Sequence, residues 1–332
     1  MHLKDMLGDC QMSEYITKAY ACYNKNERIR ERSTSGGIFY TLAKYVIEKK
    51  RGWVCGAVFD SNFVVTHVIT NDLKSVERMM GSKYPQSNMK QCFADVYELL
   101  QKNEVVLFTG TPCQVYGLKA FLGKDYEGLI TLDFVCHGVA SPKIWREYLQ
   151  LFVKEQPKSI VFKDKIKGWK KWHVKYELMN KTIYRYGIYD IYMRSYLSGI
   201  NHRPACYHCF FKGIDRDSDF TVADCWGVGE KNRDLNDDKG LSALLVHSSA
   251  AKMIFELISN ELVFKEYSPD ILMQTNWACV KSSKQPENRD DFFKVYCKST
   301  MKEKKKLLQK NFGLNFKRKL SYMKKKILKE VL

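Results

Sequence analysis

The fold is decided by the stretch Val105-Val106-Leu107-Phe108-Thr109-Gly110-Thr111-Pro112-Cys113, in which an apolar run of strand length ends abruptly in a turn. Helical spacing of apolar residues resumes from Gln114 to Leu122. The same order returns downstream, with a strand predicted from Leu129 to Val135, a loop at Cys136-His137-Gly138, and a helix start at Ser141-Pro142. Strand, loop and helix repeated in this way predict parallel strands with helices on the faces of the sheet.

The rest of the chain adds further elements around this unit. Its pattern predicts helices over residues 38–47, 92–100, 189–197 and 249–258, and strands over residues 53–59, 63–69, 160–162, 172–178, 182–186, 219–223 and 241–247. We therefore predict an α/β fold with a mixed, partly parallel sheet and helices on its faces, plus a cysteine-rich loop segment and a basic C-terminal helix. The expected divisions are an N-terminal extension (1–30), an N-terminal α/β half (31–150), a C-terminal half with the cysteine-rich loop (151–297) and a basic tail (298–332).

Composition narrows the class of protein. A hydrophobic fraction of 45% over 332 residues is typical of a globular chain, and no apolar run reaches the length that a membrane span needs. The first residues contain no apolar stretch of the kind found in a secretory signal, so we expect a cytoplasmic protein. Eleven cysteines, an odd number in a long chain, do not suggest a disulfide framework. Five of them sit among apolar or mixed residues and are expected to pack as small core side chains: Cys22, Cys55, Cys92, Cys279 and Cys297.

The net charge of +18 is concentrated at one end of the chain. Residues 298–332 hold thirteen Lys or Arg side chains and only two acidic ones, Glu303 and Glu330. The excess of positive charge therefore belongs mainly to this tail and does not indicate a basic surface for binding nucleic acid. No nucleic acid is expected as a partner. From Leu320 to Val331 apolar residues recur with helical spacing between lysines. Such a helix either lies on an anionic membrane surface or packs on the body of the protein.

Four cysteines can meet at one edge of the predicted sheet. Cys206 and Cys209 form a CxxC turn, a spacing shared by zinc sites, iron–sulfur clusters and redox disulfides. Cys113 and Cys136 each follow the carboxyl end of a strand, and neighbouring parallel strands open their loops at the same edge. Four thiolates suit a [4Fe–4S] cluster or an all-cysteine zinc site, although Cys113 and Cys136 also fit simple packing roles. Cys225 is a fifth candidate.

Six short motifs together resemble the coenzyme F420 hydrogenase/dehydrogenase beta-subunit family, over residues 20–265. In chain order they are Ser35-Gly36-Gly37, Gly81-Ser82-Lys83-Tyr84-Pro85-Gln86-Ser87, Gly110-Thr111-Pro112-Cys113-Gln114, Cys136-His137-Gly138, Arg203-Pro204-Ala205-Cys206-Tyr207-His208-Cys209 and Asp224-Cys225-Trp226-Gly227. The resemblance implies FAD and one [4Fe–4S] cluster held by Cys113, Cys136, Cys206 and Cys209, and it makes Cys225 a weaker candidate. Only Cys10 and Cys22 precede the first motif, so this is a short form without the ferredoxin-like segment of longer members.

The function that the resemblance implies is flavin-dependent oxidoreduction. Electrons would pass between FAD, the cluster and a redox partner protein or a small substrate: a deazaflavin, ferredoxin or a polysaccharide-pathway intermediate. Two alternatives to this function stay open. The first is a non-catalytic electron-transfer or docking subunit, and the second is a zinc protein with an all-cysteine site.

Three loops are candidates for holding the flavin. Ser35, Gly36 and Gly37 precede a helix, whose free N–H groups bind phosphate, although the same residues also make a plain cap and turn. Lys83 is a candidate contact to the phosphate or the flavin ring, although an isolated loop lysine is often simply solvated. Thr109, Gly110, Thr111 and Pro112 form the turn at the sheet edge where the ring would approach the cluster. No catalytic residue is assigned.

Overall fold

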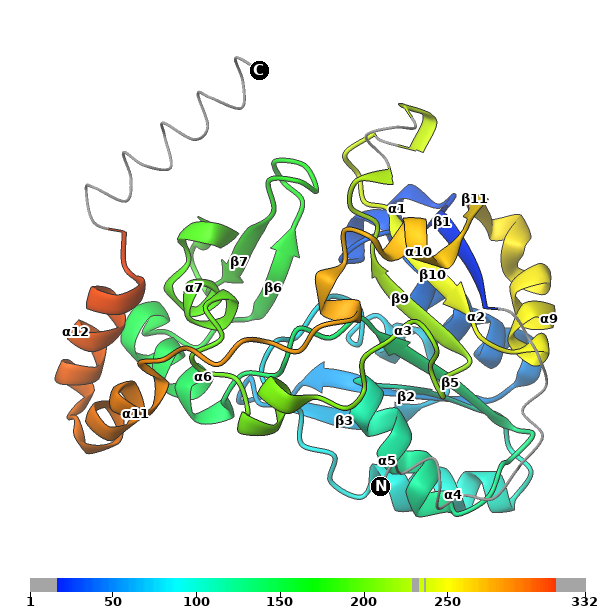
Figure 1. Cartoon of the computed structure of the whole chain (residues 1–332), viewed down its shortest axis with the longest axis horizontal. Helices are drawn as coiled ribbons and strands as arrows, with labels where there is room; N and C mark the ends of the chain where they lie inside the picture. The colour runs from blue at the N-terminus through cyan, green and yellow to red at the C-terminus, as the bar shows by residue number, and fades with distance from the viewer. Residues whose placement is uncertain (1–16, 229–232, 236, 315–332) are drawn as a thin grey trace.

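The computed structural model describes residues 17–228, 233–235 and 237–314 (Figure 1). Its main sheet has eight strands: β1 (Lys18–Asn24), β2 (Trp53–Phe59), β3 (Val65–Thr70), β4 (Val106–Thr109), β5 (Leu129–Phe134), β9 (Phe220–Asp224), β10 (Ser242–Val246) and β11 (Leu262–Tyr267). They are ordered β11-β1-β10-β9-β5-β4-β2-β3. The neighbours β2, β4, β5 and β9 are parallel and all other pairs are antiparallel. The predicted mixed, partly parallel sheet is confirmed.

Helices cover both faces of this sheet because its strands are apolar on both sides. On β4, Leu107 packs on one face with helices α2 (Ile38–Lys50) and α9 (Ser249–Ile258). Its neighbours Val106 and Phe108 point to the opposite face, where α4 (Cys92–Gln101) and α5 (Pro112–Leu122) pack. The antiparallel part of that second face is covered by α10 (Pro269–Met273) and the segment that follows it. Two short helices, α1 (Glu27–Arg32) and α3 (Leu73–Val76), flank the first strands.

A second, antiparallel sheet stands at the other end of the molecule (Figure 1). It consists of β6 (Ser159–Asp164), β7 (His173–Glu177) and β8 (Thr182–Tyr186), and it shares an aromatic core with α6 (Pro142–Tyr148) and α7 (Ile191–Leu197). Helices α11 (Arg289–Lys298) and α12 (Met301–Phe312) extend this end by packing against α6. Helix α12 belongs to the segment 298–332 that was expected as a basic tail, so the first part of that segment is a helix packed on the protein. The apolar stripe expected from Leu320 to Val331 lies outside the described residues.

Two elements differ from the expected ones, the first strand and helix α5. Residues 18–24, within the segment expected as an N-terminal extension, form β1 in the interior of the main sheet, between β10 and β11. Helix α5 begins at Pro112, two residues earlier than its apolar pattern indicates, because Thr111 and Gln114 form a capping box ahead of a proline suited to a first turn. None of the described helices combines the length and apolar character needed to cross a bilayer.

Candidate functional site

The four predicted cysteine ligands lie on three loops at the carboxyl edge of the parallel strands. Cys113 is in the first turn of α5, directly after β4, and Cys136 lies two residues beyond the end of β5. Cys206 is in a short 3₁₀ turn, Pro204–His208, and Cys209 immediately follows it. Cys113 is exposed and the other three are partly buried. The neighbouring parallel strands β4 and β5 place Cys113 and Cys136 at the same edge of the sheet, as their strand pattern predicts.

Backbone contacts hold the Cys136 loop against the CxxC segment. The amide of Arg203 donates to the carbonyl of Val139 at 3.0 Å, and Ala140 pairs with His202. Gly138 adopts a φ of 121° and faces the His202 ring so closely that a Cβ at this position would lie 2.7 Å from Nδ1. Because only glycine tolerates both the conformation and the contact, Gly138 allows the two loops to meet.

The thiols influence one another electrostatically. Burial raises the pKa of the Cys136 thiol to about 12; the Gly138 amide and Lys212 oppose this rise, while Cys206 and Cys113 add to it. Burial also raises the pKa of Cys206, with Cys113 and Cys209 adding to the shift. Several thiolates in one place repel one another unless a cation compensates them. A bound metal centre supplies that compensation and deprotonates its thiol ligands.

The donor set fits an all-thiolate centre, but the side chains are not arranged around one. Among residues 17–228, 233–235 and 237–314, no three His, Cys, Asp or Glu side chains stand in a metal-binding arrangement. The Cys113 sulfur instead lies 3.1 Å from the hydroxyl of Thr111, and the Cys136 sulfur accepts from the Gly138 amide at 3.4 Å. The ligand assignment therefore stays a prediction, supported by the shared location of the four residues.

Cys225 lies apart from these four residues. It is 1% exposed and packs among the buried apolar residues beneath the antiparallel part of the sheet. Its electrostatic neighbour is the core residue Cys22, whose thiol pKa is raised by burial and further by Cys225. This location favours a packing role for Cys225.

The Ser35-Gly36-Gly37 loop uses its polar groups within the protein. The Ser35 hydroxyl donates to the carbonyl of Leu241 at 2.5 Å, and the Gly36 amide donates to the Ser242 hydroxyl at 2.8 Å. Gly37 has a φ of 93° and caps α2 without a side-chain bond. These contacts join the loop to β10, so the residues support the edge of the sheet.

Lys83 is also bonded internally. Its ammonium group donates to the carbonyls of Met79, Met80 and Gly81 at 3.0–3.2 Å, and desolvation lowers its pKa to about 7. The loop that contains Lys83 lies beside the Ser35-Gly36-Gly37 loop, because the hydroxyl oxygens of Ser82 and Thr34 are 2.9 Å apart. Lys83 thus closes the turn after α3 and does not present a free cation.

The Thr109–Pro112 turn is close to Lys83 through a buried histidine. The Nε2 atom of His67 lies 3.0 Å from the carbonyl oxygen of Thr109. Burial lowers the pKa of His67 to about 4, and Lys83 is near enough to add to the shift. The Thr109 hydroxyl donates to the carbonyl of Cys55 at 3.1 Å. The three predicted flavin loops therefore gather at one edge, although most of their polar groups have partners within the chain.

Sequence reasoning missed a charged pair that links the two sheets. Lys163 on β6 and Asp224 at the end of β9 form a salt bridge of 2.5 Å, with side chains only 12% and 15% exposed. A register shift between Val161 and Asp164 marks a bulge in β6 at this point, and bulges re-aim side chains. Although burial opposes the charged form, Asp224 and Tyr84 raise the pKa of Lys163 above its ordinary value.

Aromatic side chains surround this pair. The Lys163 ammonium lies 5.5 Å from the ring centre of Trp226, which stacks on Trp169 at 4.2 Å. Burial lowers the pKa of His137, next to Cys136, to about 4, and Lys163 adds to that shift. The charge of one lysine thus interacts with residues from three of the quoted motifs, at positions 84, 137 and 224. The only sequence signal was a lysine near the end of a short strand, which is too common to single out.

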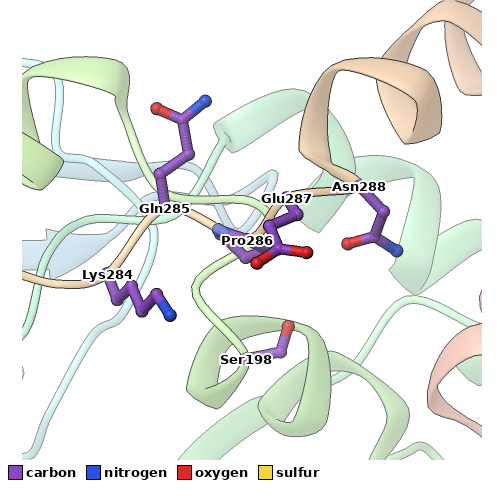
Figure 2. Close-up of a pocket in the computed structure, with 6 residues that line it drawn as sticks. All are labelled: Ser198, Lys284, Gln285, Pro286, Glu287 and Asn288. Atoms are coloured by element: carbon purple, nitrogen blue, oxygen red, sulfur yellow. The ribbon is translucent and has the colours of Figure 1, made fainter.

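Two surface depressions in the described part of the chain are lined by none of the predicted site residues. The larger, of about 370 Å³, lies between Ser198 at the end of α7 and the extended segment 284–288 (Figure 2). The smaller, of about 130 Å³, lies beside α1 and α2. Each is open to solvent, so neither identifies a substrate.

Comparison with known proteins agrees with the resemblance drawn from the motifs. The family model for the C terminus of the coenzyme F420 hydrogenase/dehydrogenase beta subunit matches residues 103–270, about half of the chain. Among solved structures, a chain of the F420-reducing [NiFe] hydrogenase complex from Methanosarcina barkeri is similar in fold. It has a TM-score of 0.53 and 16% identity, and the match covers 92% of this chain and 94% of that one. No curated protein sequence matches. With its cysteine loops grouped at the edge of a mixed sheet and the family model matched from residue 103 to residue 270, the chain belongs to the coenzyme F420 hydrogenase/dehydrogenase beta-subunit family.

Proposed function

We propose that this protein is an iron–sulfur flavoprotein that transfers electrons between FAD, one [4Fe–4S] cluster and a partner protein or small substrate. The observation that carries the proposal is that four cysteines from three separate segments lie close together: Cys206 and Cys113 raise the pKa of the buried Cys136 thiol, and Cys113 and Cys209 raise that of Cys206. Membership of a family of hydrogenase and dehydrogenase subunits supports a redox role. When bound, the cluster would supply one-electron transfer, and the flavin would convert single electrons into pairs.

The chain's own residues would provide the shape and electrostatics of the site. The capping box at Thr111 fixes the start of α5, whose free N–H groups favour negative charge close to Cys113. The Lys212 ammonium group donates to the carbonyls of Cys136 and Ala278 at 2.7 Å, which places a positive charge beside the thiolates. Both candidate cations have partners within the chain, Lys83 three carbonyls and Lys163 the Asp224 carboxylate, so each would face a bound flavin as part of a bonded group.

The test is the visible spectrum and metal content of anaerobically purified protein. We expect flavin bands over a broad iron–sulfur absorption, with about four iron atoms per chain for one cubane cluster. Cys113→Ser should lose most of the iron, whereas Cys297→Ser, a matched change at another exposed cysteine, should keep it. A colourless protein that contains zinc would overturn the proposal in favour of a structural zinc site.

The physiological context is also proposed from the family resemblance. Polysaccharide-pathway intermediates, deazaflavins and ferredoxin are the candidate substrates and partners, in the cytoplasm or at the inner face of the membrane. Supplying these compounds one at a time to the reduced protein, with flavin reoxidation followed by absorbance, distinguishes a catalytic oxidoreductase from a docking subunit. Reoxidation by a small molecule supports the enzyme; reoxidation only by a carrier protein supports the electron-transfer subunit.

A further inference from the structure

An exposed aromatic side chain stands directly beside the cysteine loops. Phe210 follows Cys209 and is 91% exposed. Its loop is nevertheless fixed to the neighbouring segment at both ends: the Cys209 amide donates to the Ser282 hydroxyl at 3.0 Å, and the Gly213 amide donates to the Cys279 carbonyl at 2.8 Å. A large apolar side chain held in solvent by ordered backbone is typical of an interface anchor.

Other exposed apolar side chains extend from the same place. Tyr116, one turn after Cys113 on α5, contacts Phe211, with 5.2 Å between the ring centres. Trp277 and Val280 are about half exposed on the segment bonded to the Phe210 loop, and Trp277 contacts His137, next to Cys136, at 5.1 Å. We call Tyr116, Phe210, Trp277 and Val280 the Phe210 surface. A grouped apolar surface of this kind marks an interaction site more often than scattered single residues do.

The segments that form the Phe210 surface and carry the cysteines are basic, although Asp215 and Asp217 follow one of them and the Lys119 ammonium group donates to the Asp217 carbonyl. These four segments, residues 113–122, 135–143, 203–212 and 277–285, contain no Asp or Glu, although the chain has 37 acidic residues. They contain six cationic residues: Lys119, Lys143, Arg203, Lys212, Lys281 and Lys284. A positive surface around an apolar centre attracts and orients a partner with an acidic surface.

We propose that the Phe210 surface is the docking site of an acidic iron–sulfur electron-carrier protein. The inference rests on the proposed function, because it is the nearby cysteine centre that gives the encounter its purpose. In each encounter one electron would leave the reduced iron–sulfur centre of the carrier, which is thereby oxidised, and would reduce the centre that Cys113, Cys136, Cys206 and Cys209 would hold. A small apolar contact with a charged rim suits a weak, rapidly reversible complex, as electron transfer requires.

The probe is a plant-type [2Fe–2S] ferredoxin, a small acidic one-electron carrier, added to the holoprotein. Titration calorimetry measures binding, and stopped-flow absorbance measures reduction of the holoprotein by the reduced ferredoxin. Phe210→Ala and Lys281→Glu should each weaken binding and slow reduction about tenfold. Leu257→Ala, at an exposed position on α9, is the matched control and should change neither. Raising the salt concentration should weaken binding by the wild type.

The two proposals fail in different ways. If the purified protein has no iron–sulfur or flavin absorption, the proposed function fails, and calorimetry still decides whether the Phe210 surface binds ferredoxin. If the chromophores are present and dithionite reduces all variants equally, but Phe210→Ala and Lys281→Glu bind and accept electrons as the wild type does, the docking site is wrong. Equal iron content in the variants establishes that the substitutions acted on the surface.

Discussion

At the scale of single residues, the Lys163–Asp224 pair is a nearly buried electrostatic contact between the two sheets. Removing one charge leaves the other without compensation in a place that water reaches poorly. We expect Lys163→Met to lower the free energy of unfolding by about 3 kcal/mol, measured by urea denaturation. The raised pKa of Lys163 means that this contribution is complete at neutral pH and is lost only as the pH rises through that value.

Two further variants separate the buried pair from general charge effects. Lys163→Met combined with Asp224→Leu should recover part of the lost stability, because no unpaired charge remains. Lys252→Met, which breaks the exposed pair with Glu256 on α9, should cost less than about 1 kcal/mol. A Lys163→Met protein as stable as the wild type would contradict the structural role given to this pair.

At the scale of elements, helix α12 decides how the basic tail can be tested. Leu308 and Phe312 are buried in a core shared with α6, and the Lys304 ammonium group donates to Glu147 at 2.8 Å. A deletion that removes α12 would therefore expose this core. Truncation after Leu314 removes only the residues outside the described part and leaves α12 in place.

The expected outcome concerns binding to lipid. If the residues from Leu320 to Val331 form the basic amphipathic helix that their sequence predicts, full-length protein should sediment with vesicles that contain anionic lipid at low salt, and the protein truncated after Leu314 should not. Vesicles of neutral lipid are the control. Should both forms remain in the supernatant with anionic vesicles, the tail has another role, such as contact with a partner.

Elements with local patterns were predictable and those with distant partners were not. The strands at residues 53–59 and 129–134 and the helix at 92–101 match their predictions to within a residue or two, because each carries its own periodicity. Cys113 was expected in a loop and lies in a helix, since capping by Gln114 decides where α5 begins. The shared edge of Cys113 and Cys136 followed from the strand pattern, and Cys206 and Cys209 were singled out by their CxxC spacing. Lys163 was missed because its partner, Asp224, is 61 residues away.

At the scale of the whole molecule, buried histidines should make the fold sensitive to acid. Burial lowers the pKa of His67 to about 4 and that of His247 to about 3, below the ordinary value of 6.5. Between the lowered and the ordinary values the unfolded chain binds more protons than the folded chain, so stability falls as the pH falls. Asp133, whose pKa burial raises to about 6, opposes part of this loss because the folded state then holds the extra proton.

The measurement is urea unfolding at a series of pH values. From pH 7 to pH 4.5, His67→Gln combined with His247→Gln should lose about 5 kcal/mol less than the wild type, because glutamine takes up no proton on unfolding. Lys252→Met serves as the control, because it changes an exposed charge without changing a buried group. Parallel stability curves for the wild type and the double variant would show that the native pKa values of these two histidines are close to the unfolded value, against the effect given to burial.

The position of β1 also sets the order in which the chain can be completed. Of the described strands it is the earliest in the sequence, yet it pairs only with β10 and β11, so that Lys18 faces Val246 and Ala19 faces Tyr267. During synthesis its apolar residues have no strand partner until β10, which ends at Val246, has been made, long after the central strands β2, β4 and β5 are available to pair with one another. A nascent chain arrested before that point should therefore carry an unpaired amino-terminal strand that chaperones can bind.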